Sequence, residues 1–198
     1  LRVAHELYVA GHLIQAAVAH HRATGSTKLL DVATRLGDHL CATFGPGKLD
    51  KTGGTPNFEM ALVELYRETG KQCYLDLARF FVEKRGDAFP AEDVLERLAV
   101  VDLEPLRELN EFAGAHAVRA LYLACGATDV CLDMGDPELE RALRKLWEDT
   151  VSTKMYVTCG FGARYQLESF GEAYELPNRR AYAETCASLA CMFWGHRL

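Results

Sequence analysis

Positive charge, long apolar runs and the common catalytic signatures are all scarce in this sequence of 198 residues. It has 22 lysines and arginines against 28 aspartates and glutamates, a net charge of −6, and no basic stripe. This balance argues against a nucleic-acid partner, because phosphate contacts require clustered cations. No apolar run is long enough to span a membrane, and the first residues lack the regions of a signal peptide. We therefore expect neither a nucleic-acid nor a membrane partner.

The usual nucleotide and nucleophile motifs are missing as well. The sequence contains no G-x-S-x-G elbow, no phosphate loop, no dinucleotide fingerprint and no finger of paired cysteines. Its seven cysteines are odd in number and do not follow the spacing of a disulfide framework. Reduced thiols are typical of a cytoplasmic protein, and the cytoplasm is the location that we expect.

Helical periodicity dominates what is present. With 49% apolar residues the chain can bury a core, and its length fits a single domain over residues 1–198. Apolar side chains recur at helical spacing in eight segments. The expected helices cover about 5–24, 27–40, 57–69, 72–84, 94–101, 106–133, 138–151 and 180–194. Gly126 is a candidate break in the sixth helix, and only 154–158 has the character of a strand.

A repeated pattern joins some of these helices. Residues 24–33 and 69–78 both have the sequence T-G-x4-L-D-x-A between two apolar helices, and 134–139 is a weaker third copy. Repeated helical hairpins predict a solenoid or a closed α/α toroid, because each pair must bury its inner face on its neighbours. The unequal spacing of the copies and the long loop-like segment 155–178 favour the toroid. A tetratricopeptide-like binding module is the alternative.

Carboxylates gather in the second half of the chain. Glu168 lies in a long loop rich in glycine and aromatic residues, and such loops are often functional. A carboxyl group there can act as a general acid if its surroundings raise its pKa. From the residues alone an exposed, solvated carboxylate is the favoured interpretation. Glu172 and Glu175 are equal competitors for any catalytic role, because spacing does not select among them.

Glu184 and Cys186 have side chains that can bind zinc. On a regular helix these two positions point about 200° apart, so both reach one ion only at a helix start or a distortion. Without further information Cys186 is better interpreted as a small core residue. His12 and His116 lie on apolar helical faces, where a lone histidine is usually structural. Facing the axis of one toroid, the two histidines could line a polar pocket for sugar hydroxyls.

Seven blocks of the chain resemble one family. Residues 5–14, with the letters H-E-L-Y-V-A-G-H-L-I, are similar to the stretch H-E-L-Y-C-A-G-H-L-I of the bacterial β-L-arabinofuranosidases. This family of glycoside hydrolases was once known only as a domain of unknown function. The blocks follow in the family's order and cover nearly the whole chain. They are residues 5–14, 61–70, 115–122, 154–158, 171–178, 181–187 and 193–198.

The resemblance implies an all-α fold, an (α/α)6 toroid built from helical hairpins, of which this chain is an incomplete part. It implies a retaining enzyme that hydrolyses terminal β-L-arabinofuranosides with a zinc-bound cysteine nucleophile, so that the partner is an L-arabinofuranoside-type carbohydrate. Carried over residue by residue, Glu168 is the acid/base, and Glu184 and Cys186 are zinc ligands. His12 and His116 correspond to histidines that contact the sugar.

The chain departs from the family at several positions. The family's nucleophile and last zinc ligand come from a Cys-Cys pair beyond the matched region. Thr55 replaces a sugar-contacting histidine, and Cys159 and Leu167 each replace a common glycine. We therefore expect little or no hydrolase activity from this chain alone, and either a fragment or a protein that closes its toroid by self-association.

Two other functions stay open on the residues alone. One is a non-catalytic helical-repeat module that binds a sugar or a protein. The other is a different α/α-toroid sugar enzyme, such as an unsaturated glucuronyl hydrolase, which needs an acidic pair and no zinc.

Overall fold

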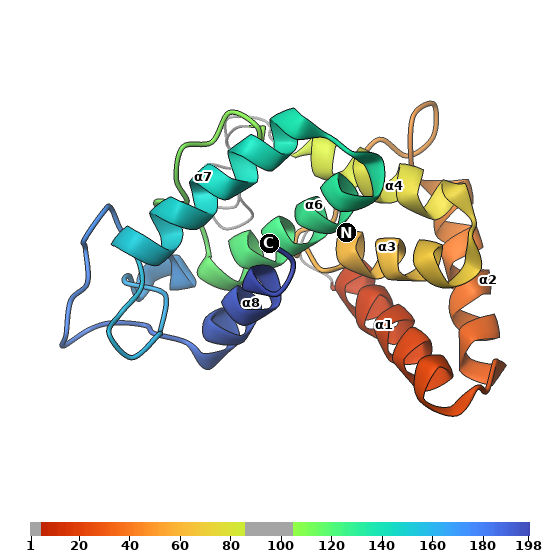
Figure 1. The fold of residues 1–198 in the computed structure, drawn as a ribbon, viewed down its shortest axis with the longest axis horizontal. Helices are drawn as coiled ribbons and strands as arrows, with labels where there is room; N and C mark the ends of the chain where they lie inside the picture. Colours follow the sequence, from red (N-terminus) through yellow and green to blue (C-terminus); the bar gives the residue numbers. More distant parts are fainter. Residues whose placement is uncertain (1–4, 86–104) are drawn as a thin grey trace.

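Every regular element in the described part of the chain is a helix (Figure 1). The structure, a computed structural model, describes residues 5–85 and 105–198. Its helices are α1 (Glu6–Thr24), α2 (Lys28–Thr43), α3 (Phe58–Thr69), α4 (Gln72–Lys84), α6 (Ala117–Met134), α7 (Pro137–Thr153), the short 3-10 turn η2 (Gln166–Glu168) and α8 (Thr185–Gly195). The all-α prediction is confirmed. The expected helix over 94–101 lies outside the described residues.

Three glycines turn the chain between consecutive helices. Gly25 ends α1, Gly70 ends α3 and Gly135 ends α6, each with a positive φ of 71–72° that favours glycine. The threonine before the first two of them, Thr24 or Thr69, donates its hydroxyl to the carbonyl four residues earlier at 2.7 Å. The repeated T-G pattern is therefore a helix stop followed by a hairpin turn, and all three copies were predicted correctly.

The helices form two layers along an arc (Figure 1). The inner helices α1, α3, α6 and α8 pack against one another in that order. The outer helices lie behind them, with α2 on α1, α4 on α3 and α6, and α7 on α6. Alternation of inner and outer helices along the chain is the arrangement of an α/α toroid. None of the helices in the described ranges is long and apolar enough to cross a membrane.

The inner layer is closest where α6 crosses α3. A Cβ atom on Gly126 would lie 2.6 Å from the Cβ of Glu59 and 3.0 Å from the amide nitrogen of Met60. Glu59 is itself buried and paired with the buried Arg85 at 3.1 Å. From the sequence Gly126 was a candidate break in the helix. In the structure α6 continues through it, and the missing side chain allows α6 and α3 to meet.

Aromatic packing fixes the last inner helix. Trp194 of α8 is fully buried, and its indole nitrogen donates to the hydroxyl of Thr128 on α6 at 2.9 Å. Its ring meets Trp147 of α7 edge-on, with centroids 5.2 Å apart, and lies against Phe112. This contact joins α6, α7 and α8 around one side chain.

Two expected helices begin later than predicted. Residues 106–116 were expected to be helical, but they form turns before α6 starts at Ala117. Gly114 has a φ of +77°, and its N–H donates to the carbonyl of Phe170, which draws the backbone into a loop contact. Residues 180–184 are also not helical, because the amides of Ala183 and Glu184 donate to the loop around residues 161–162.

The expected strand at 154–158 is wrong. Lys154 ends α7, with its N–H still donating to the carbonyl of Thr150. Tyr156 then opens a tight turn, accepting from Cys159 at 2.8 Å and donating to Gly160 at 3.0 Å. Val157 and Thr158 are exposed and Tyr156 is partly buried, and none of them has a neighbouring strand to pair with in the described ranges.

Replacing Gly126 by alanine should destabilise the fold by about 2–3 kcal/mol, because the new methyl group meets backbone that cannot move freely. Urea unfolding followed by circular dichroism measures the loss. Leu132→Ala is the control, since Leu132 is on the same helix and 61% exposed, and it should change stability by no more than about 0.5 kcal/mol. Equal effects of the two changes would contradict the close approach.

Asp136 fastens the start of α7. Its carboxylate accepts from the amides of Glu138 and Leu139 and forms a two-pronged ion pair with Arg107 at 3.0 and 2.6 Å. The Arg107 guanidinium is the largest cause that holds the pKa of Asp136 well below its ordinary value of 3.8. Folding therefore gains stability from this carboxylate above its unfolded pKa and loses it as the pH falls.

Asp136→Asn keeps the cap acceptor and removes the ion pair. We expect a loss of about 1 kcal/mol at pH 7, shrinking as the pH falls below about 4 because protonation weakens the wild type. Urea unfolding of both proteins across this range tests the trend, with the exposed Glu148→Gln of α7 as control. A difference that stays constant with pH would rule out the carboxylate as its cause.

Candidate active site

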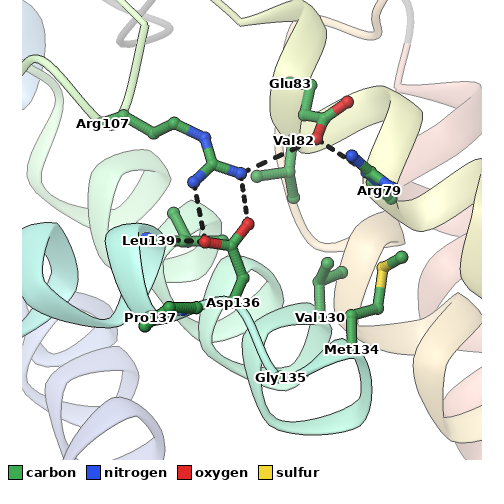
Figure 2. A pocket seen from close by; sticks show the side chains of 10 residues that line it. All are labelled: Arg79, Val82, Glu83, Arg107, Val130, Met134, Gly135, Asp136, Pro137 and Leu139. Atoms are coloured by element: carbon green, nitrogen blue, oxygen red, sulfur yellow. Dashed lines mark hydrogen bonds and ion pairs between the residues drawn. The ribbon is translucent and has the colours of Figure 1, made fainter.

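The cavity at the turn between α6 and α7 is a structural joint. It has a volume of about 230 Å³, and Figure 2 shows its charged side chains pointing toward one another. Arg107 pairs with Asp136 and lies 3.7 Å from Glu83, which in turn pairs with Arg79 at 2.7 Å. Because these charges satisfy one another, we assign no ligand to this cavity.

The candidate site lies at the other end of α6. Its first part is the loop that carries Glu168. Backbone hydrogen bonds join this loop to the segment before α6. The amide of Phe170 donates to Ala115 at 2.9 Å, and Phe170 accepts from Gly114 at 3.1 Å. Within the loop, Arg164 and Ser169 exchange two backbone hydrogen bonds at 3.0 and 3.1 Å. These pairings hold Glu168 beside the first turn of α6.

A buried lysine also contacts this loop. Lys154, at the end of α7, has a side chain that is only 1% exposed. Its ammonium group donates to Glu111 at 2.6 Å and to the carbonyl of Gly171 at 3.3 Å. One cation thus connects α7, the segment before α6 and the loop that carries Glu168.

The backbone around the candidate acid has unusual conformations. Leu167 and Glu168 have φ angles of +57° and +53°, and Cys159 has +60°. Left-handed backbone costs a residue other than glycine about 1–2 kcal/mol. Leu167 and Cys159 are two of the positions at which, by the resemblance, this chain replaces a glycine that is common in the family. The structure supplies the reason for glycine there.

Glu168 meets a histidine. Its Oε2 lies 2.9 Å from Nε2 of His116, the residue that precedes the first turn of α6. Burial and the charge of Arg119 lower the pKa of His116, while the Glu168 carboxylate acts in the opposite direction. The other ring nitrogen, Nδ1, is buried without a hydrogen-bond partner in the described part of the chain. Glu168 and His116 can exchange a proton, and Nδ1 of His116 has hydrogen-bonding capacity that the described residues do not use.

Glu184 and Cys186 meet at the start of α8. Glu184 is the residue before the helix, with extended φ and ψ of −74° and 136°, so its side chain can turn toward Cys186. A hydrogen bond to Glu184 is the largest cause that raises the pKa of the Cys186 thiol. A helix start is one of the two settings, with a helix distortion, in which we expected both side chains to reach a common ion. Cys186 is exposed, so its expectation as a core residue is wrong.

Tyrosines connect these groups. Tyr182 hydrogen-bonds to both Glu168 and Glu184, and burial together with these carboxylates raises its pKa. Tyr8 of α1 has its pKa raised by burial and by the nearby charges of Cys186 and Glu184. Its ring meets the exposed His12 edge-on at 4.5 Å. The five residues singled out from the sequence are therefore gathered around the inner helices α1, α6 and α8.

Sequence reasoning missed the tyrosines. Tyr182 lies two residues before Glu184, and outside a helix such positions can fall on one side of the chain. The signal was hidden because we expected a helix from residue 180. Tyr122 of α6, whose pKa is raised by burial and by nearby Tyr8 and Cys186, carried no signal beyond its place in an apolar helix.

The donor set agrees with zinc in kind but is incomplete. A carboxylate and a thiol in contact are ordinary zinc ligands, and Oε2 of Glu184 is buried without a hydrogen-bond partner among the described residues. A zinc site usually has three or four protein ligands. Within 5–85 and 105–198, no three of the histidine, cysteine and acidic side chains come together as a metal site. The residues present fit one half of a zinc site.

The paired helical layers form part of an α/α toroid, and carboxylates, histidines and tyrosines gather at the ends of its inner helices. The comparisons with known proteins specify it further. The family model described as the β-L-arabinofuranosidase, GH127 catalytic domain, matches residues 2–198. The chain belongs to this family.

Its relatives are considerably longer. The non-reducing end β-L-arabinofuranosidase of Bifidobacterium longum subsp. longum is 36% identical over all of this chain, which covers 33% of that protein. A GH127 β-L-arabinofuranosidase from Geobacillus stearothermophilus T6 superposes with a TM-score of 0.90 at 38% identity, over 98% of this chain and 33% of that one. A second GH127 β-arabinofuranosidase gives 0.89 at 40%, over 98% and 30%. The chain thus spans about a third of the length of these relatives, and its helices form part of an α/α toroid.

Glycine at position 159 should stabilise the protein. Cys159→Gly relieves the left-handed strain, and we expect a gain of about 0.5–1 kcal/mol after the entropy cost of glycine is deducted. Leu167→Gly should give a similar gain next to Glu168. Tyr165→Gly is the control, because Tyr165 is exposed in the same loop but has an ordinary φ of −63°. It should lose stability, and a gain there would show that loop glycines help for some other reason. Thermal unfolding measures all three.

Proposed function

We propose that this chain supplies the acid/base and two zinc ligands of a retaining β-L-arabinofuranosidase site acting on terminal β-L-arabinofuranosides. The observation that carries the proposal is the convergence of Glu168, His116, Tyr182, Glu184 and Cys186 in a chain that belongs to the GH127 family. The names of the relatives give the substrate class.

Glu168 is the proposed proton carrier. It protonates the glycosidic oxygen as the bond breaks and then takes a proton from the incoming water. His116 and Tyr182 orient its carboxyl group, and the left-handed backbone at Leu167 and Glu168 fixes the direction from which it approaches. His12 and His116 are the proposed contacts to sugar hydroxyls.

Glu184 and Cys186 are the proposed zinc ligands of this chain. Zinc, when bound, favours deprotonation of its thiol ligands, which makes a nucleophile available at neutral pH. In its absence the hydrogen bond to Glu184 raises the pKa of the Cys186 thiol. We propose that the nucleophilic thiol and the remaining ligands come from outside these 198 residues. The isolated chain is then inactive toward a chromogenic β-L-arabinofuranoside, and turnover by it would refute this division.

A binding module is the second candidate. It is favoured by the donor set, since two ligands in the described residues do not complete a zinc site. In that role the chain binds a carbohydrate or protein without chemistry and closes its toroid by self-association. Light scattering that finds only monomers would count against self-association.

Cobalt(II) gives a test that does not depend on activity. Added to the metal-free chain, it should bind weakly, with a Kd in the micromolar range or above, which corresponds to a binding free energy no more favourable than about −8 kcal/mol. The bound ion should produce a thiolate-to-metal absorption band. Cys186→Ser should abolish the band and Glu184→Gln should weaken binding about tenfold or more. Cys159→Ser, which removes an exposed thiol elsewhere, should leave both unchanged. A band that survives in Cys186→Ser, or no band in the wild type, would refute the half-site.

A further inference from the structure

Two cysteines lie close together in the outer layer, and the proposed function does not use them. Cys41 of α2 is half-buried and Cys73 of α4 is exposed. The thiol of Cys41 donates to the backbone carbonyl of Cys73 at 3.3 Å, and the two side chains are also within hydrogen-bonding reach of each other. They come from two separate helical hairpins, 32 positions apart.

Polar contacts hold the two helices in register around this pair. Asp38 of α2 accepts from Lys71 at 2.8 Å and from the hydroxyl of Tyr74 at 2.6 Å. Both partners flank Cys73 in sequence, and Asp38 lies one helical turn before Cys41. The cysteines are therefore held opposite each other by the ion pair and the buried tyrosine.

We propose that Cys41 and Cys73 form an oxidisable pair that closes to a disulfide between α2 and α4 when the protein meets a peroxide. A disulfide needs sulfur atoms at about 2 Å and Cα atoms at about 4.4–6.8 Å. The sulfur of Cys41 lies 3.3 Å from the backbone carbonyl oxygen of Cys73, and the side chain of the exposed Cys73 is within hydrogen-bonding reach of it.

The reaction balances with hydrogen peroxide as the oxidant. The Cys73 thiolate attacks one peroxide oxygen, an S–O bond forms, the O–O bond breaks, and the departing hydroxide leaves as water after it takes a proton. Cys41 then loses its proton and attacks the sulfur of the Cys73 sulfenic acid. The S–S bond forms, the S–O bond breaks, and a second water leaves. The two thiols lose two electrons, which the peroxide gains.

The surroundings set the order of the two steps. Burial first, and then the neighbouring Cys73, raise the pKa of the Cys41 thiol to about 12, while Lys48 lowers it. Cys41 is thus a poor first nucleophile and Cys73, in contact with solvent, reacts first.

The cross-link has a consequence for stability. It joins two outer helices and closes a loop that contains all of α3, the helix on which the inner layer is packed. A covalent link of this length restricts the unfolded chain more than the folded one. Oxidation should therefore raise the melting temperature by about 5–10 °C in a chain of this size.

The test uses the reduced chain and limited hydrogen peroxide. After unreacted thiols are blocked with N-ethylmaleimide, the intact mass should show one internal disulfide. Peptide mapping without reductant should link Cys41 to Cys73, and dithiothreitol should reverse both the link and the rise in melting temperature. Cys41→Ser and Cys73→Ser should each lose the link and the rise. Cys159→Ser, an exposed thiol outside the pair, should keep both.

Each variant is compared with its own reduced form, so a loss of packing at Cys41 does not imitate the result, and Cys41→Ala provides a second version of that change. A disulfide-linked dimer through Cys73 would overturn the proposal. So would sulfinic acid at Cys73 without an internal link, or a cross-link that survives in Cys73→Ser.

Discussion

The close approach of α6 to α3 at Gly126 is the constraint on which the rest of the structure depends. Any side chain at that position would push the two inner helices apart, and the buried Glu59–Arg85 pair lies directly beneath the contact. Because α6 also packs against α4, α7 and α8, its position affects the contacts at both of its own ends. One end carries the ion-paired joint at Asp136, and the other carries His116.

The site draws on the starts of inner helices. His116 precedes α6, and Glu184 precedes α8, so both lie where unpaired amide groups give a helix its partial positive charge. This partial charge favours a carboxylate, whereas at Cys186 the hydrogen bond to Glu184 outweighs it and raises the pKa of the thiol. The outer helices contribute turns and anchoring contacts. This division explains why the polar groups meet at one end of the inner layer although they are far apart in sequence.

Prediction from sequence succeeded where a local rule decides the structure. The hairpins follow from glycines that can adopt a left-handed turn, and the helices follow from the spacing of apolar side chains. The family resemblance named Glu168, Glu184 and Cys186, yet it could not show that Tyr182 bridges two of the carboxylates. That contact depends on residues 180–184 leaving the helical conformation, which happens because their amides find partners in a loop about twenty residues earlier. The same holds for residues 106–116. Their apolar pattern favours a helix, but the N–H of Gly114 donates to the carbonyl of Phe170 instead of to a carbonyl within a helix. No local pattern contains such information.

Lys154 anchors the loop that carries Glu168 less firmly than it anchors the helices. Its buried ammonium group donates to Glu111 in the segment before α6 and lies 3.6 Å from Asp149 of α7, while the loop contributes only the carbonyl of Gly171. When the loop moves away, the ammonium loses one neutral acceptor and keeps both carboxylates, so no unpaired buried charge is created. The loop can therefore shift, and change the orientation of the candidate acid, while α7 and the segment before α6 stay joined.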